Sequence, residues 1–178
     1  MLRDLNGGAL ASPKLKVINA DALQWLEQSQ EVFDFVVVDF PDPSNHSLGK
    51  LYSTAFYRLL KQHVAETGRI VVQATSPMYA RESFWTVVVS LEAAGWQTAP
   101  YHALVPSFGE WGFILAGRRD YRPPATIPVA TRFLTPDALP ALFHFPTDMA
   151  RIQAEPNRLD NQNLVRIFER EWGRVQAH

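Results

Sequence analysis

Two aspartates, separated by two residues and followed by a proline, form the segment of this sequence that is best suited to chemistry. They are Asp39 and Asp42, in the run Asp39-Phe40-Pro41-Asp42-Pro43. Carboxylates can hold a cationic amine, or accept a proton from an amine while that amine attacks an electrophile. Asp and Pro are also common turn formers. The pattern alone therefore leaves two interpretations open, a binding site and an ordinary loop.

Two further polar residues follow predicted strands. Asp21 comes directly after the alternating segment 15–20, and Gln73 lies near the end of the apolar segment 69–74. Ligands of open parallel sheets bind beyond the carboxyl ends of the strands, so we expect both residues near the two aspartates. An N-cap on the following helix is the structural alternative for Asp21. For Gln73 the alternative is a hydrogen bond to nearby backbone.

Hydrophobic periodicity predicts alternating strands and helices that would place these residues at one edge of a sheet. The near-continuous apolar run Phe33–Val38 is typical of a central parallel strand that is buried on both faces. A turn around Gly109 predicts an antiparallel hairpin at the end of the sheet. The predicted strands are 15–20, 33–38, 69–74, 97–105 and 112–116, and helices begin near Ala22, after Ser53 and at Arg81. The expected fold class is α/β, with a mostly parallel sheet.

Helix boundaries and a change in composition predict how the rest of the chain is organised. The helix capped by Ser53 is expected to carry its apolar face as far as Val64. After Arg118, prolines 123, 124 and 128 predict a stiff connector. Thr135-Pro136-Asp137 is a typical helix start, and a last helix is predicted over about 160–172. We expect a sheet domain over residues 1–118, with a connector and helical tail packed on it over 119–178.

The composition excludes several classes of protein. The chain has 178 residues, with 17 basic and 18 acidic side chains, a formal net charge of −1 and no cysteine. The lack of cysteine excludes disulfide scaffolds, thiolate nucleophiles and cysteine-based metal sites, and the near-neutral charge argues against a nucleic-acid partner. The histidines lack metal-ligand spacing, no apolar stretch approaches about 18 residues, and residues 1–8 do not form a signal peptide. We expect a cytoplasmic protein without a metal site.

The acidic run and its surroundings resemble a known family. The segments Val37–Pro43, Gly49–Tyr52 and Phe56–Leu60 are similar to those of the polyamine synthases, which are spermidine synthase and related aminopropyltransferases. The resemblance continues through the shorter segments Asn6–Leu10, Val17–Ala22, Val71–Gln73, Val105–Phe108 and Gly112–Phe113. Asp42–Asn45 and the tail segments Asn157–Gln162 and Glu169–Trp172 look most like a bacterial subgroup whose longer members carry an N-terminal membrane domain.

The resemblance implies a Rossmann-like fold of the adenosylmethionine-methyltransferase type and a transferase activity. An aminopropyl group would pass from decarboxylated S-adenosylmethionine, a co-substrate, to a diamine such as putrescine, with no prosthetic group. Asp39 matches the general base of the family motif. The other residues that the resemblance assigns are Asp42, Gln73, Tyr52 and Phe108 for substrate binding, and Asp21 and Ala22 for the nucleoside donor. Tyr52 is expected to act structurally, and Phe108 falls where many members have a tyrosine.

The resemblance also implies that parts of the family fold are missing from this sequence. Members have two earlier strands and a glycine-rich loop, and the two strands lie between those predicted here at 15–20 and 33–38. We therefore expect the carboxyl-terminal portion of such a protein, catalytic in the complete protein, with two outcomes open for this piece, an active site or an incomplete and inactive one. Its exposed sheet edges favour a homo-oligomer or a missing N-terminal segment as partner. In a longer form with a membrane domain, it would lie on the cytoplasmic side.

Two other functions stay open. One is a catalytically inactive homologue that binds polyamines or serves in assembly. The other is an adenosylmethionine-dependent N-methyltransferase, whose Asp/Asn-Pro-Pro-aromatic motif also follows a strand, although Phe40-Pro41-Asp42 departs from that motif.

Overall fold

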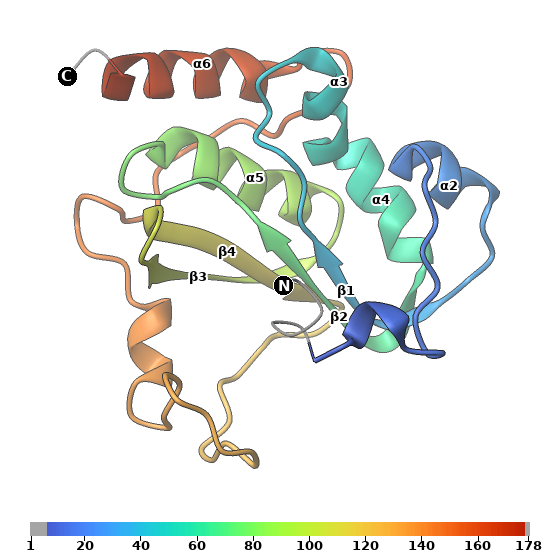
Figure 1. Cartoon of the computed structure of the whole chain (residues 1–178). Coiled ribbons are helices and arrows are strands. Elements are labelled where there is room, and N and C mark those ends of the chain that lie inside the picture. The colour runs from blue at the N-terminus through green and yellow to red at the C-terminus, as the bar shows by residue number, and fades with distance from the viewer. Residues whose placement is uncertain (1–6, 177–178) are drawn as a thin grey trace.

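The structure, a computed structural model, describes residues 7–176 and contains a four-stranded sheet. The strands are β1 (Phe33–Val38), β2 (Val64–Gln73), β3 (Gln97–Val105) and β4 (Gly109–Gly117), in the order β1-β2-β4-β3. β1 and β2 are parallel, whereas β4 is antiparallel to both β2 and β3 (Figure 1). The predicted α/β class and the terminal hairpin are confirmed. The sheet of the described residues is mixed rather than mostly parallel, because β4 lies between β2 and β3 and is antiparallel to both.

Helices cover one face of this sheet. They are α4 (Thr54–Gln62), α5 (Arg81–Ala93) and α6 (Asn163–Gln176), with the shorter α2 (Ala22–Gln28) and α3 (His46–Gly49) beside them (Figure 1). The 3-10 helices are η1 (Ala9–Ala11), η2 (Lys50–Tyr52) and η3 (Leu139–Phe143). The core forms between the helices and the sheet, where Val38, Ile70, Val72 and Ile114 meet Phe56, Tyr57, Phe84 and Leu91. Burial of these side chains is the main stabilising contribution.

The start of α4 follows its predicted cap, but its end does not follow the prediction. The hydroxyl oxygen of Ser53 accepts from the backbone N–H of Phe56 at 3.2 Å. The helix ends at Gln62, and Val64 pairs with Phe33 as the first residue of β2, so its assignment to the helix was wrong. The physical reason is that a buried valine suits the end of a helical stripe and the start of a strand equally well.

The predicted strand at 15–20 is absent from the structure. These residues have no regular secondary structure, and Leu15, Val17 and Ile18 are exposed. A strand needs a neighbour to satisfy its backbone groups, and no ladder among residues 7–176 includes this segment. The alternation of apolar and polar residues was therefore not sufficient to predict a strand.

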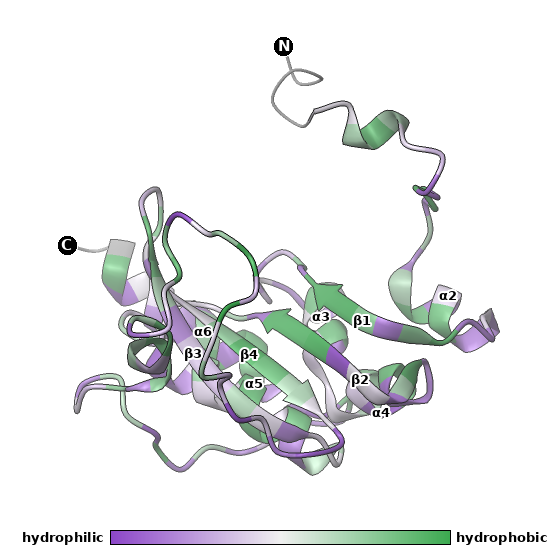
Figure 2. Ribbon diagram, turned by 90° about the horizontal axis from the view of Figure 1, so that it is seen from below, coloured by the Kyte–Doolittle hydropathy of each residue, from purple (hydrophilic) through white to green (hydrophobic). Residues whose placement is uncertain are grey.

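β1 is an edge strand of the described sheet, and its predicted burial on both faces was wrong. Val38 faces the helices and is buried, whereas Phe35 and Val37 on the opposite face are 57% and 65% exposed. No helix of the described chain covers that second face at β1 and β2, where apolar strands are open to view (Figure 2), whereas η3 packs against β3 through the ring contact of Phe143 with Tyr101. A homo-oligomer, or a further segment that covers this edge, stays a prediction.

The tail packs on the helical face. The predicted last helix is confirmed as α6, which lies against α5 and contributes the fully buried Leu164 to the core. Residues 135–138 form turns rather than a helix start, and only the short η3 follows them. The division of the chain at residue 118 stays a prediction. No helix among residues 7–176 is long and apolar enough to cross a membrane.

Candidate functional site

The parallel pair β1 and β2 brings two of the predicted site residues to the same edge. Val38 pairs with Val72, so Asp39 and Gln73 occupy equivalent positions, one residue beyond this pair. Gln73 is half-buried and still pairs with Phe113 of β4, whereas the Asp39 side chain is exposed. The expectation from strand order, that the polar residues gather beyond the carboxyl ends of the parallel strands, is met for these two positions.

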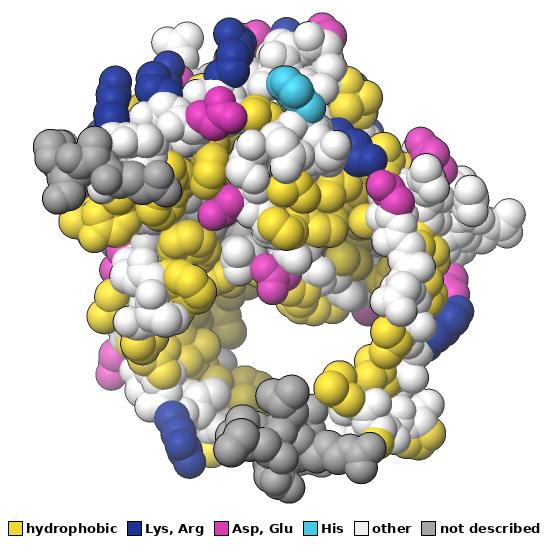
Figure 3. Space-filling view, turned by 45° about the horizontal axis from the view of Figure 1, so that its top comes forward, with side chains coloured by type: hydrophobic (Ala, Val, Ile, Leu, Met, Phe, Trp, Pro, Cys, Tyr) yellow, Lys and Arg dark blue, Asp and Glu magenta, His cyan; other side chains and the backbone are white. Residues whose placement is uncertain are grey.

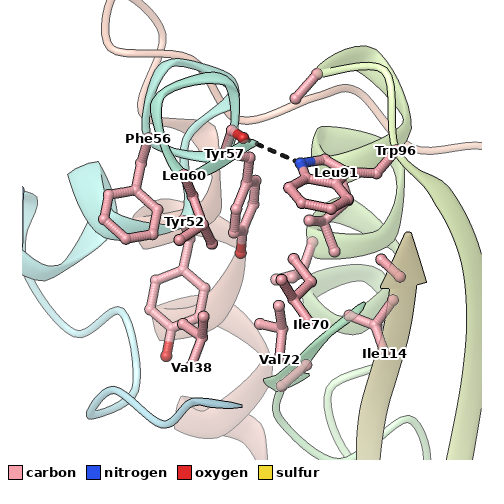
Figure 4. Packing of buried hydrophobic residues seen from close by; sticks show 14 of the residues in the cluster. Val38, Tyr52, Phe56, Tyr57, Leu60, Ile70, Val72, Leu91, Trp96 and Ile114 are labelled. Atoms are coloured by element: carbon pink, nitrogen blue, oxygen red, sulfur yellow. Dashed lines mark hydrogen bonds between the residues drawn. The ribbon is translucent and has the colours of Figure 1, made fainter. Parts of the chain in front are cut away.

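Tyr52 holds the backbone of the acidic loop, residues 39–45. Its hydroxyl donates to the carbonyl oxygens of Phe40 and Pro41, at 3.1 and 3.0 Å. The ring is 3% exposed, and its hydroxyl end points down beside Val38 (Figure 4). The Phe40 ring packs edge-on against it at 6.3 Å. Tyr52 therefore shapes the loop that carries the acids.

The charges of both acids act on the Tyr52 hydroxyl. Burial, and then the negative charges of Asp42 and Asp39, raise the pKa of Tyr52 well above its ordinary value. Its hydroxyl therefore stays protonated and remains a donor to the loop. The half-buried position of Asp42 raises the pKa of that carboxyl as well.

Neither Asp39 nor Asp42 has a cationic partner among the residues that the structure describes. Nearby acids without a counter-ion create a local negative potential, which favours a cationic ligand. The space-filling view shows that acidic side chains lie among hydrophobic ones on the face that is drawn (Figure 3). Such an arrangement can bind an ammonium group and accept a proton from it.

Asp21 caps the N-terminus of α2, which is the structural alternative that the sequence left open for it. Its Oδ1 accepts from the backbone N–H groups of Leu23 and Gln24, at 3.0 and 3.2 Å. Its Oδ2 accepts from Lys50 Nζ at 3.0 Å. The hydrogen bond from Lys50, followed by that from Gln24, lowers the pKa of Asp21. Sequence reasoning missed Lys50, because no local signal connects residues that lie 29 positions apart.

A hollow of about 570 Å³ lies beside the start of α2. Its walls include Ile18, Ala22 and Trp25, which are mostly apolar, together with the stems of Lys14 and Lys16. The predicted donor-binding residue Ala22 lines this hollow, and Asp21 is its neighbour in the chain. Flat aromatic groups bind well in pockets with apolar walls and a few polar groups at the rim.

Phe108 lies on the turn between β3 and β4, and is 63% exposed. Its ring contacts Trp111 at 5.3 Å, and Trp111 contacts Trp172 of α6 at 6.4 Å. Among the described residues, no hydrogen bond or ring contact joins Phe108 to the acidic loop. The structure thus groups Asp39, Asp42, Tyr52 and Gln73 more closely than it groups Phe108 with them. The segment Asn6–Leu10, which the resemblance includes, begins outside the described residues, at Asn6.

Comparison with known families places this geometry in context. Residues 1–123 match the family model described as "Spermine/spermidine synthase domain". The chain is 59% identical over 170 residues to polyamine aminopropyltransferase 2 of Ralstonia nicotianae, covering 94% of this chain and 33% of that protein. It is 49% identical over 175 residues to the polyamine aminopropyltransferase of Leptospira interrogans, covering 98% and 35% respectively. The chain therefore spans about a third of the length of these curated relatives.

Solved structures share the fold. A spermidine synthase crystallised with the transition-state analogue AdoDATO superposes with a TM-score of 0.67 at 18% identity, covering 82% of this chain and 52% of that one. Spermidine synthase from Thermotoga maritima gives a TM-score of 0.66 at 17% identity, covering 82% and 51%. The α/β arrangement of sheet and helices is thus the one found in spermidine synthases.

Proposed function

The chain belongs to the spermine/spermidine synthase family, and from this premise we propose that it acts in aminopropyl transfer to a diamine. The donor is decarboxylated S-adenosylmethionine and the acceptor is a diamine such as putrescine. One observation carries the proposal: Asp39 and Asp42 lie beyond the end of β1 with no cationic partner among the described residues. The names of the relatives, polyamine aminopropyltransferases, support it.

The proposed reaction is a single displacement. The unprotonated amine nitrogen attacks the carbon that is bonded to the sulfonium of the donor. The carbon–nitrogen bond forms as the carbon–sulfur bond breaks, and the electron pair goes to sulfur, which leaves 5′-methylthioadenosine. Asp39 accepts the proton that the amine loses. Asp42 holds the other, cationic end of the diamine, because a half-buried carboxylate binds an ammonium group more strongly than an exposed one does.

We propose further that the remaining predicted residues divide between the two substrates. Gln73 and Phe108 belong to the amine side, and Phe108 has no hydroxyl, so it can contribute apolar contacts only. Asp21 and Ala22 belong to the donor side, where the hollow beside α2 suits an adenine ring. Asp21 would bind the donor while it continues to cap α2. Tyr52 acts on the loop rather than on the substrate.

Two alternatives are less well supported. Family membership favours aminopropyl transfer over N-methylation, and the retained acids favour a catalytic site over a purely binding module. We propose the cytoplasm as the location, or the cytoplasmic face of a membrane for a longer form, since a chain without cysteine suits a reducing compartment.

The experiment is a product assay. The chain is incubated with putrescine and decarboxylated S-adenosylmethionine, and spermidine and 5′-methylthioadenosine are quantified by mass spectrometry. Where the donor site is complete, we expect both products in equal amounts, with turnover reduced by about 10²-fold or more in Asp39→Asn. Unchanged turnover in that variant would remove Asp39 from the mechanism. A methylated amine in place of spermidine would favour the methyltransferase alternative.

A further inference from the structure

A single buried asparagine in the tail joins four elements around the segment that follows the acidic loop. Asn157 is 0% exposed. Its backbone N–H donates to the hydroxyl of Ser90 in α5 at 2.8 Å, and its backbone oxygen accepts from the N–H of Thr54 in α4 at 2.9 Å. Its side-chain Nδ2 donates to the carbonyl of Gly49 at 2.9 Å, and Oδ1 accepts from the N–H of Leu164 in α6 at 3.3 Å.

Gly49 is the point at which the tail meets the segment His46–Tyr52, which consists of α3 and η2. A Cβ added to Gly49 would lie 2.6 Å from Cγ2 of Val165, so α6 packs directly against its backbone. A second contact joins the same two parts, because the ring N–H of His46 donates to Oε1 of Gln162 at 2.7 Å. The tail therefore contacts this segment at two points, His46 and Gly49.

The backbone of Gln162 shows that this contact is built into the tail. Its φ is 38°, a left-handed conformation that is unusual for a residue other than glycine. The N–H of Gln162 donates to the carbonyl of Arg158 at 2.9 Å, and Oδ1 of Asn161 accepts from the N–H of Arg158 at 2.8 Å. These hydrogen bonds stabilise the turn that aims Gln162 at α3.

The far end of the same segment is Tyr52, whose hydroxyl holds the acidic loop at Phe40 and Pro41. Gly49 and Tyr52 are connected by the 3-10 helix η2, over which the chain rises by only about 2 Å per residue. The N–H and the hydroxyl of Ser53 both donate to the carbonyl of Lys50, at 3.2 and 2.6 Å, which closes this turn. Because this hydrogen-bonded turn is short, we expect a displacement of Gly49 to move Tyr52 as well.

From this connection we propose that Asn157 is a positioning residue for the acidic loop, acting through Gly49 and Tyr52. The tail then sets the geometry of the site although none of its residues touches substrate. The inference rests on the proposed function where it concerns amine binding, but its structural part is independent of that function. If Asn157 only stabilised the fold, its substitution would lower the free energy of unfolding without changing the surroundings of Tyr52.

The test compares two variants of the same buried junction. Asn157→Asp replaces the Nδ2 donor by an oxygen that cannot donate to the Gly49 carbonyl when ionised. Ser90→Ala removes the partner of the Asn157 N–H and leaves the Gly49 contact in place, so it is the matched control for stability. Both proteins carry 3-fluorotyrosine, and the ¹⁹F resonance of Tyr52 is assigned by its loss in Tyr52→Phe. Putrescine binding is measured by calorimetry and unfolding by denaturant titration.

We expect Asn157→Asp to shift the Tyr52 resonance beyond its line width and to weaken putrescine binding by about tenfold or more. Ser90→Ala should lower stability but change neither quantity. An unchanged Tyr52 resonance in folded Asn157→Asp would overturn the proposal, and so would an equal shift in Ser90→Ala. If the wild-type chain binds no putrescine while the resonance shifts as expected, the proposed function fails and the positioning role stands.

A second variant serves if Asn157→Asp does not fold. Gln162→Ala removes only the hydrogen bond to His46, at the surface of the same contact. We expect a smaller shift of the Tyr52 resonance in the same direction, with little loss of stability. No shift in Gln162→Ala would then count against the proposal.

Discussion

The ammonium group of Lys50 lies 3.0 Å from Oδ2 of Asp21, and this ion pair joins the turn after the acidic loop to the start of α2. The proposed amine side and the proposed donor side are thus connected by a direct contact. Because Asp21 also caps α2, a change at Lys50 reaches the hollow beside that helix.

Lys50→Met should raise the pKa of Asp21 toward its ordinary value, since the hydrogen bond from Lys50 is the largest cause of its lowering. A carboxyl whose pKa is lowered in the folded state stabilises the fold above its unfolded pKa, and this stabilisation is lost as pH falls through the folded pKa. The stability difference between wild type and Lys50→Met should therefore shrink in acid. An NMR titration of the Asp21 carboxyl measures the shift. An unchanged titration midpoint would show that the contact is not formed in solution.

Tyr52→Phe should loosen the acidic loop. The change removes the only donor of the side chain and leaves two partly buried carbonyl oxygens without it. We expect the free energy of unfolding to fall by about 1–3 kcal/mol, with weaker putrescine binding. Denaturant unfolding and calorimetry measure the two effects.

Tyr57→Phe is the matched control for that prediction. The hydroxyl of Tyr57 is buried and has no hydrogen-bond partner among the described residues. Its removal should leave stability unchanged or slightly higher, because a buried hydroxyl without a partner is unfavourable. If Tyr57→Phe were as destabilising as Tyr52→Phe, the loop contact would not explain the effect at Tyr52.

Asp42→Asn should stabilise the protein at neutral pH. Burial raises the pKa of Asp42, so the folded state favours its neutral form. Its contribution to stability is fully present below the unfolded pKa and is lost as pH rises through the folded pKa. The gain from Asn should therefore be seen at pH 7.5 and disappear near pH 3, in parallel denaturant titrations. A loss of stability at pH 7.5 would mean that Asp42 has a favourable partner that this account omits.

Glu171→Ala should uncap α5. The N-cap residue of α5, Ala80, offers no side-chain hydrogen bond. The carboxylate of Glu171 in α6 accepts instead from the N–H groups of Glu82 and Ser83, both at 2.9 Å. We expect a loss of about 1–2 kcal/mol, measured by denaturant unfolding. Glu169→Ala, an exposed position on the same helix, is the control and should have little effect.

Local sequence patterns predicted the elements whose stability is decided locally. The apolar run Phe33–Val38 predicted a strand, and Ser53 predicted the start of α4 through a hydrogen bond only three residues long. The prediction of a strand at 15–20 was wrong because a strand needs a partner for its backbone, and the alternation of side chains does not show whether one is present. The prediction that β1 is buried on both faces was wrong for a similar reason, because burial depends on which other elements cover Phe35 and Val37.

The acidic residues of the candidate site could be predicted from the sequence, but the residues that hold the surrounding elements in place could not. Asp39 and Gln73 follow strand ends, and strand pairing brings them together. Lys50, Asn157 and Glu171 act on partners 29, 108 and 89 residues away, at Asp21, Gly49 and Glu82. No spacing in the sequence marks such contacts, because they form only when distant parts of the chain pack together: η2 against the start of α2 for Lys50, and the tail against α3 and α5 for the other two.

The most direct test of the account is a calorimetric titration of putrescine into the wild-type chain, Asp42→Asn and Asp34→Asn. Asp34 is an exposed aspartate of β1, so its variant makes the same change in net charge at a position outside the acidic loop. Wild type and Asp34→Asn should bind putrescine equally, and Asp42→Asn should bind it at least about tenfold more weakly. Equal binding by all three proteins, or no binding by the wild-type chain, would contradict the account.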